Sequence, residues 1–408
     1  MKKSKLISTG LVLLTMASCS HHDVKLPEVI PPGNETKIES KDTIKNEQAP
    51  VVEIKNYDET FQSSLKNIWG VYFKEPFNES RSLDIFIATN RNMKGNTFGC
   101  SNSQFGIDIE NPNQLRFGVC RINVPKNHST GEIQFTNDNK QSSHKFYKVV
   151  QSKTIKEEFM FDFIKRSKRT PLIFVHGFNV KYQDAILRAS QIAYDLKYQG
   201  PVILFTWPSG AGDGFLDDKM LTKTYEHNKN GALESVKLFK ELISNFYEHE
   251  ISINLVVHSM GHQVVLRALN ELGENFAKNP EVQTKKIINE LILNAPDFEV
   301  SEFQSMAENI LKTSKRITLY CSYNDKAMVA SSSINKTQRL GACANTEGID
   351  SINAGLVDDT TFGTGHSYYS SRAILTDVFQ VLLGIDAPTR LFIKKSEPNS
   401  PEKYYLRN

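Results

Sequence analysis

The spacing of hydrophobic residues along the chain changes near residue 165. Upstream of it, four short stretches alternate or run apolar between breaks rich in Asn, Gly and Pro, a pattern typical of strands. Downstream, short continuous apolar runs alternate with longer amphipathic stretches of helical spacing. The pattern predicts a β-rich N-terminal extension over 56–165 and an α/β domain over 166–390. The four upstream strands are expected at 83–89, 115–124, 131–136 and 145–151.

The downstream strands are apolar on both faces, which is typical of parallel strands covered by helices on both sides. Strands are expected at 171–177, 201–207, 251–259, 287–297, 316–325 and 352–357, with helices at 181–198, 225–247, 262–272, 302–311 and 367–383. This alternation predicts a doubly wound, mostly parallel α/β sheet. Residues 391–408 are expected to form a C-terminal tail.

The first 20 residues have the pattern of an export signal. Basic residues precede an apolar run from Leu6 to Ala17 that is too short to span a bilayer. Small residues then stand directly before Cys19, which resembles the lipobox of bacterial lipoproteins. We therefore expect a signal peptide over 1–18 and an acylated Cys19 that anchors the protein in the membrane of the cell envelope. An ordinary secretory signal is the alternative.

The segment after Cys19 lacks the apolar content that folding requires. Residues 19–55 are rich in Pro, Glu, Lys, Asn and Thr and are expected to form a disordered tether. Ser20 stands where an aspartate would favour the inner membrane, so an outer-membrane destination is favoured in a Gram-negative cell. His21 and His22 have no Cys or carboxylate at ligand spacing, so the sequence indicates no metal site. No organic cofactor is indicated either.

The net charge of the chain argues against nucleic acid as a partner. The 408 residues contain 49 Lys and Arg against 46 Asp and Glu, a formal net charge of +3. The lysines of the expected signal peptide account for that excess, so the mature chain carries no net charge. This leaves no electrostatic reason to expect nucleic-acid binding.

Four cysteines follow Cys19, and an even number in an exported chain favours disulfides. Cys100 and Cys120 lie in similar Phe-Gly contexts, while Cys321 and Cys343 flank one loop region. Of the three pairings that four cysteines allow, we expect these two local pairs. Four buried free thiols are the alternative.

Ser259 lies where an apolar strand runs into a glycine and a helix, the context of a nucleophile elbow. The segment reads Val256-Val257-His258-Ser259-Met260-Gly261, with Val257 in place of the usual first glycine. A sharp turn at this point presents a serine hydroxyl at the carboxyl end of the sheet. The alternative is a serine that only caps the following helix.

A serine nucleophile needs a base that is itself oriented by an acid. Asp325 ends a predicted strand, and His366 is the one histidine downstream of the helix that follows Ser259. The order Ser259, Asp325, His366 is that of α/β-hydrolase triads. Asp297 ends the preceding strand; we interpret it as a loop or helix-capping residue, and as the next candidate for the acid.

An oxyanion hole needs backbone donors near the nucleophile. The amide of Met260, directly after Ser259, is one candidate, and the amide of Phe178, after the strand end His176-Gly177, is the other. His176 and His258 are expected to brace these loops through hydrogen bonds and not to act as bases.

Several blocks in order resemble a bacterial α/β-hydrolase family of unassigned function. They are HGFN at 176–179, WPS at 207–209, HSMG at 258–261, APDF at 295–298 and GHSYY at 365–369. They span roughly 165–385, and FIATNR at 86–91 resembles the N-terminal extension of that family. The resemblance implies an α/β-hydrolase fold and a serine hydrolase triad at Ser259, Asp325 and His366, but it implies no substrate.

Together these patterns predict a membrane-anchored serine hydrolase that cleaves a carboxylic ester, with a small acyl ester or a lipid as substrate. Cleavage of a thioester or an amide by the same triad is one alternative. The other is a non-catalytic envelope lipoprotein that keeps the hydrolase fold as a binding or structural scaffold.

Overall fold

The computed structural model describes residues 81–136, 138, 140–210, 218–278, 286–357 and 365–407. They belong to one compact unit, Asn56–Asn408. The expected signal peptide, the candidate lipidation site Cys19 and the tether lie outside the described residues. None of the described helices combines the length and the apolar character needed to cross a membrane.

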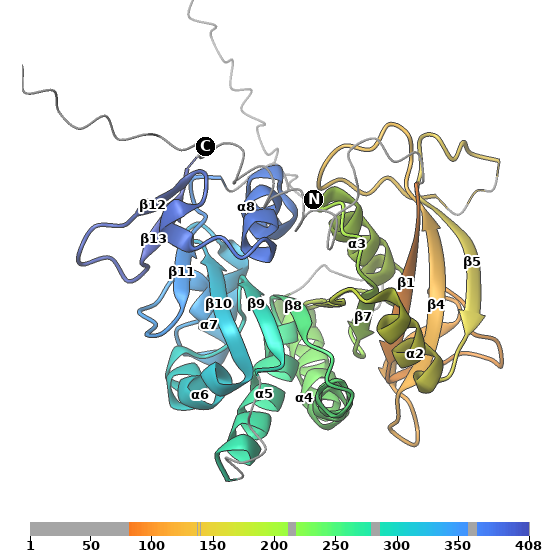
Figure 1. Cartoon of the computed structure of the whole chain (residues 1–408), viewed down its shortest axis with the longest axis horizontal. Helices are drawn as coiled ribbons and strands as arrows, with labels where there is room; N and C mark the ends of the chain where they lie inside the picture. The colour runs from red at the N-terminus through yellow and green to blue at the C-terminus, as the bar shows by residue number, and fades with distance from the viewer. Residues whose placement is uncertain are drawn as a thin grey trace, which may run out of the picture. The chain divides into compact units, whose positions relative to one another are not determined.

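An eleven-stranded sheet runs through the described part of the chain in the order β12-β13-β11-β10-β9-β8-β6-β7-β1-β4-β5 (Figure 1). From β1 to β13 the neighbouring strands are parallel, whereas β4, β5 and β12 pair antiparallel at the two edges. The mostly parallel α/β sheet expected from the apolar runs is confirmed. The strands are β1 Ser82–Thr89, β4 Arg116–Asn123, β5 Lys148–Thr154, β6 Leu172–Val175, β7 Val202–Thr206, β8 Ile253–His258, β9 Ile288–Asn294, β10 Ser314–Cys321, β11 Asp350–Asn353, β12 Ile393–Lys395 and β13 Tyr404–Leu406.

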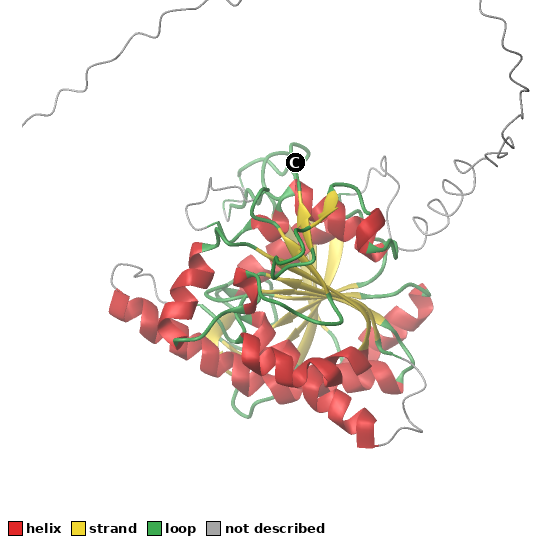
Figure 2. Cartoon of the chain, turned by 90° about the vertical axis from the view of Figure 1, so that its left-hand side faces the viewer, coloured by secondary structure: helices red, strands yellow, loops and turns green. Residues whose placement is uncertain are grey.

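Helices lie on both faces of this sheet (Figure 2). Because successive side chains of a strand point to opposite faces, Phe174 of β6 joins the core under α3 and α8, whereas Ile173 and Val175 join the core under α2, α4, α5 and α6. Every residue of β6 is therefore buried, which explains its continuous apolar run. The helices are α2 Glu157–Ser167, α3 Tyr182–Asp195, α4 Asp218–Glu248, α5 Gly261–Lys278, α6 Val300–Thr313, α7 Lys326–Asn335 and α8 Arg372–Leu382.

Two helix starts differ from the expected positions. The helix α4 begins at Asp218, ahead of the expected residue 225, and α8 begins at Arg372 instead of residue 367. In the second case the side chain of Ser371 accepts a hydrogen bond from the Ile374 amide and caps the helix. The residues after His366 form a separate short 3₁₀ turn, Tyr368–Ser370.

The N-terminal extension is strand-rich, but its strands belong to the same sheet as those of the α/β region. β1 pairs in parallel with β7, with Ile85 opposite Val202, and antiparallel with β4 on its other side. Ile85 and Ile87 are fully buried in the core that also contains Phe174. The described strands on the two sides of residue 165 therefore share one hydrogen-bonded sheet and one core.

One expected strand is absent, and four short strands lie where none was expected. Residues 131–136 form no strand: Phe135 makes a single bridge to Tyr147, and the polar groups of Gly131 bind side chains of α3 instead of a neighbouring strand. Two short strands, β2 Arg91–Met93 and β3 Phe105–Ile109, form an unexpected second sheet. The expected tail contributes β12 and β13, which are too short to show a period in the sequence.

Two disulfides connect the four cysteines after Cys19 in the local pairs. Cys100 is bonded to Cys120 of β4, and Cys321 at the end of β10 is bonded to Cys343. All four side chains are buried. Cys321 is the last residue of β10 and lies four positions before Asp325, the candidate acid. The Cys321–Cys343 bond therefore links the segment that contains Asp325 to a residue 22 positions after Cys321.

The shared sheet predicts that the chain cannot be divided at residue 165. A fragment 166–408 lacks β1, so β7 loses a partner strand and the core loses Ile85 and Ile87. We expect this fragment to show no cooperative thermal unfolding by circular dichroism, whereas the matched fragment 56–408 does. Cooperative unfolding of 166–408 would show instead that the extension is a separate domain.

Candidate active site

Ser259 occupies a sharp turn between β8 and α5. Its φ of +50° lies in the left-handed region that a residue with a side chain seldom adopts. The Ser259 amide donates to the Asn294 carbonyl at 3.0 Å, which holds the turn against the end of β9. Gly261 is required here because a Cβ at that position would lie 2.5 Å from the His176 carbonyl oxygen. The turn has the strained geometry of a nucleophile elbow, with Val257 accommodated as a buried strand residue.

The structure brings Ser259, His366 and Asp325 together although they lie far apart in the sequence. His366 Nε2 is 2.8 Å from Ser259 Oγ, and His366 Nδ1 is 2.7 Å from Asp325 Oδ2. The Ser259 hydroxyl therefore engages an imidazole instead of capping the following helix. The Asp325 side chain is fully buried, whereas that of His366 is 17% exposed. This is the arrangement in which an acid orients a base that can deprotonate a serine.

Asp325 is held by the helix that follows it. Its Oδ1 accepts hydrogen bonds from the amides of Ala327 and Met328, at 3.0 and 3.2 Å, so the carboxylate is the N-cap of α7. The helix N-terminus favours the negative charge, and the second carboxylate oxygen stays available to His366.

The two candidate oxyanion donors flank the serine. Gly177 lies against Ser259, because a Cβ on Gly177 would be 2.7 Å from Ser259 Cβ. Phe178 follows Gly177 directly, and Met260 follows Ser259. Within the described chain, neither the Phe178 amide nor the Met260 amide donates a hydrogen bond. Amides without an acceptor beside a serine hydroxyl can stabilise an oxyanion that develops there.

Arg91 ties the extension to the loops around the site, a role that motif analysis missed. Its guanidinium, fully buried, donates to the carbonyls of Ser209 at 2.6 Å and Val180 at 2.8 Å. It also lies 3.2 Å from His176 Nε2 and bonds to the Thr206 hydroxyl. Burial lowers the pKa of Arg91 to about 9, which leaves it protonated at neutral pH. Arg91 is the last residue of the FIATNR block. The resemblance of that block to the N-terminal extension of the family is the one feature of the sequence that points to this arginine.

Three buried histidines surround the triad as neutral groups. His176 stacks on Trp207, and His258 stacks on Tyr369 with the ring centroids 3.8 Å apart. Burial lowers the pKa of His176 and of His258 well below 6.5. His262 Nδ1 lies 2.6 Å from the Ser259 carbonyl oxygen, and burial lowers its pKa to about 3. These rings brace the loops, and the imidazole that is hydrogen-bonded to Ser259 is that of His366.

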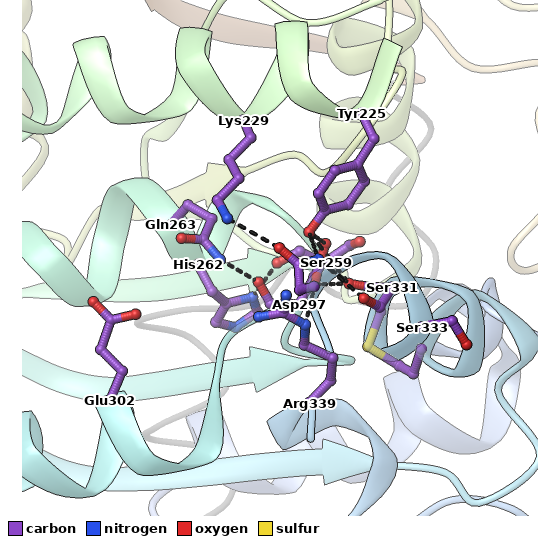
Figure 3. A network of polar contacts seen from close by, with 12 residues as sticks. Tyr225, Lys229, Ser259, His262, Gln263, Asp297, Glu302, Ser331, Ser333 and Arg339 are labelled. Carbon is purple, nitrogen blue, oxygen red and sulfur yellow. Dashed lines mark hydrogen bonds and ion pairs between the residues drawn. The ribbon is translucent and has the colours of Figure 1, made fainter. Parts of the chain in front are cut away.

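Asp297 belongs to a network of polar contacts that also contains Ser259, whose carbonyl accepts from the Asp297 amide at 3.3 Å (Figure 3). The Asp297 carboxylate accepts from the Tyr225 hydroxyl at 3.0 Å and the Ser331 hydroxyl at 2.5 Å. Arg339 Nε is 3.3 Å away, an ion pair in which both side chains are 3% exposed.

Asp297 lies in a loop, which is one of the two roles expected of it, but it does not cap a helix. α6 begins after Glu299, which makes no side-chain cap bond, and the Asp297 carboxylate turns inward to Arg339. Arg339 lies far along the chain, so no local pattern reveals the pair. In the described residues the carboxylate that contacts His366 is that of Asp325, not Asp297. No group of three or more His, Cys, Asp or Glu side chains in the described part of the chain could hold a metal ion.

The comparison with protein families agrees with this architecture. The model of a family described as an alpha/beta hydrolase of unknown function (DUF900) matches residues 151–384. Two structures of phospholipase PlaB from Legionella pneumophila, one in complex with thio-NAD, each match at 13% identity over 59% of this chain and 68% of theirs. Their TM-scores of 0.29 and 0.25 are too low to bear on activity. No curated protein matches the chain.

The buried ion pair predicts different consequences for the two strand-end aspartates. Asp297→Asn leaves the Arg339 charge buried without its partner, which lowers the free energy of unfolding by about 3–5 kcal/mol. Asp325→Asn keeps an oxygen that can cap α7, so it lowers stability by about 1 kcal/mol or less. Urea unfolding of both variants measures the difference, and equal losses would contradict it.

His262 predicts a pH dependence of stability. Its pKa is about 3 when folded and near 6.5 when unfolded, so below pH 6.5 the unfolded chain binds a proton that the folded chain does not. This contribution to stability is complete above pH 6.5 and is lost as the pH falls toward 3, by about 1.4 kcal/mol per pH unit. Urea unfolding between pH 4.5 and 6 measures it. We expect His262→Gln to reduce the slope by that amount, and an unchanged slope would refute the assignment.

Proposed function

We propose that this chain, which belongs to the alpha/beta hydrolase family of unknown function that matches residues 151–384, is a serine hydrolase that cleaves carboxylic esters. The observation that carries the proposal is the continuous path of two hydrogen bonds from Ser259 Oγ through His366 to Asp325. A hydroxyl bonded to an oriented imidazole is poised to lose its proton as it attacks.

In the proposed reaction, Ser259 Oγ attacks the ester carbonyl carbon and its proton passes to His366 Nε2. Asp325 stabilises the imidazolium, and the amides of Phe178 and Met260 donate to the oxyanion of the tetrahedral intermediate. The carbon–oxygen bond to the alcohol then breaks, and the alcohol leaves with the proton from His366. Water attacks the acyl-enzyme with His366 as base again, which releases the acid and restores Ser259.

The strain at Ser259 favours catalysis over a scaffold that only keeps the fold. A left-handed serine costs on the order of 1–3 kcal/mol and persists where the surrounding structure enforces it, most often at functional sites. A scaffold would need neither this conformation nor a buried acid on the far side of the histidine. Thioesters and amides would be cleaved through the same steps. Carboxylic esters are the proposed substrates, and thioesters and amides are the alternatives that the same triad allows.

The second part of the proposal is the location of the enzyme. The signal-like segment 1–18 and Cys19 support a lipid anchor in the cell envelope, with residues 19–55 as the tether. An outer-membrane position is favoured in a Gram-negative cell because Ser20 follows Cys19. An anchored hydrolase would meet membrane lipids and other acyl esters at short range, and these are the proposed substrates.

Steady-state hydrolysis of p-nitrophenyl butyrate tests the mechanism. We expect Ser259→Ala to lower kcat by on the order of 10⁶-fold and Asp325→Asn by on the order of 10⁴-fold, because the first removes the nucleophile and the second the acid that orients the base. The matched control is Asp297→Asn, whose carboxylate makes no described contact with His366. At a temperature where it stays folded, its loss should be below about tenfold. Hydrolysis that survives Ser259→Ala would refute the proposal.

A further inference from the structure

Two adjoining pockets lie between residues 130–135 of the extension and the helix α3. Their volumes are about 380 and 430 Å³, within the range of small-molecule sites, and both have Ile133 and Arg188 in their walls. The larger pocket is lined mainly by polar residues, among them Ser367 and Ser370. The smaller pocket is mainly apolar, since five of its eight lining residues are Ile133, Phe135, Val180, Leu187 and Tyr369.

The apolar pocket adjoins the catalytic groups on two sides. Val180 belongs to the loop that presents the Phe178 amide. Tyr369 stacks on His258, and the His258 ring centroid is 4.8 Å from that of His366. One wall of the pocket is therefore separated from the catalytic imidazole by a single side chain, and another continues from the candidate oxyanion loop.

We propose, on the basis of the proposed function, that this apolar pocket receives the acyl chain of the ester and that Ile133 and Phe135 determine its length. An ester with its carbonyl oxygen on the amides of Phe178 and Met260 has its acyl chain beside Val180, from which the chain enters the pocket. The substrates are esters of unbranched aliphatic acids of medium length. This gives the extension a role in specificity, since it supplies the two side chains that close the pocket.

The wall formed by residues 130–135 is held in place before any substrate binds. Arg188 Nη1 donates to the Gly131 carbonyl at 2.9 Å, and the Gly131 amide donates to Asp195 Oδ2 at 2.8 Å. Asp195 Oδ1 also contacts His128 Nε2 at 2.5 Å, with both side chains buried. These bonds from α3 fix a segment that belongs to no strand. A fixed apolar wall binds a chain without the entropy cost of ordering a loop.

Two charged residues, Asp184 and Arg188, and the buried His176 complete the lining of the apolar pocket. Asp184 is exposed and Arg188 is partly buried, in contrast to the buried Leu187 between them in the sequence. The Arg188 guanidinium donates to the Gly131 carbonyl and the Gln191 side chain and lies over the Tyr369 ring, so its charge already has partners in the protein. Apart from His176, the remaining lining residues are aliphatic or aromatic. A neutral hydrocarbon chain suits that lining, and each buried methylene should raise kcat/KM by about fourfold until the pocket is filled.

A chain-length series of p-nitrophenyl esters, from acetyl to decanoyl, tests the inference on the full-length protein. We expect kcat/KM of the wild type to rise with chain length to a maximum. Ile133→Trp fills the pocket, so the ratio of octanoyl to acetyl kcat/KM should fall at least about tenfold. Val150→Trp places the same side chain at an exposed position of β5 and should leave both values unchanged. A ratio that Ile133→Trp does not change would overturn the inference even if hydrolysis depends on Ser259.

Binding separates this inference from the proposed mechanism. In Ser259→Ala, calorimetry should detect binding of methyl octanoate, and Ile133→Trp in that background should weaken it at least about tenfold. If no ester is hydrolysed but this binding persists and responds to Ile133→Trp, the pocket assignment stands and the mechanism fails. If methyl octanoate does not bind, or binds equally well to both variants, the pocket assignment is wrong.

Discussion

The close approach of two turns at the ends of β6 and β8 is the constraint on which the site depends. Ser259 keeps a left-handed backbone at the end of β8, and its Cβ lies where a side chain on Gly177 would be. Gly261, in turn, leaves room for the His176 carbonyl. Without these two glycines the turns would move apart, and the amides of Phe178 and Met260 would no longer flank one hydroxyl. The parallel pairing of β6 with β8 brings the turns to the same edge of the sheet.

Residues of the N-terminal extension hold the loops around this site in place. β1 is an interior strand, and Arg91, directly beyond it, places a buried positive charge against the carbonyls of the loops that follow β6 and β7. A later segment of the extension, residues 130–135, lines the apolar pocket beside Tyr369. A buried arginine bonded to neutral carbonyls suits a fixed geometry, because it demands several acceptors at set positions. The extension therefore positions the loop that contains Phe178 and, in our proposal, selects the acyl chain.

The parts of the structure that could be predicted from the sequence have local causes. Strands such as β6 are apolar on both faces, so their runs were visible, and Ser259 was recognisable because strand, serine and glycine are adjacent. Asp325 and His366 followed from chain order, and the structure places both on the path from Ser259. The contacts that the sequence does not reveal are made between residues that lie far apart in the chain. Asp297 forms an ion pair with Arg339, which is distant in the sequence, and Gly131 is hydrogen-bonded to α3 instead of a strand. Arg91 donates hydrogen bonds to the carbonyls of residues more than 80 positions away.

The central claim is that Ser259 is an activated nucleophile, and covalent labelling tests it most directly. The folded full-length protein is treated with a fluorophosphonate, and the modified peptide is identified by mass spectrometry. The account predicts one adduct, on Ser259, with a labelling rate that falls sharply in His366→Ala because the hydroxyl then lacks its base. A folded wild-type protein that forms no adduct, or one modified at a different residue, would contradict it.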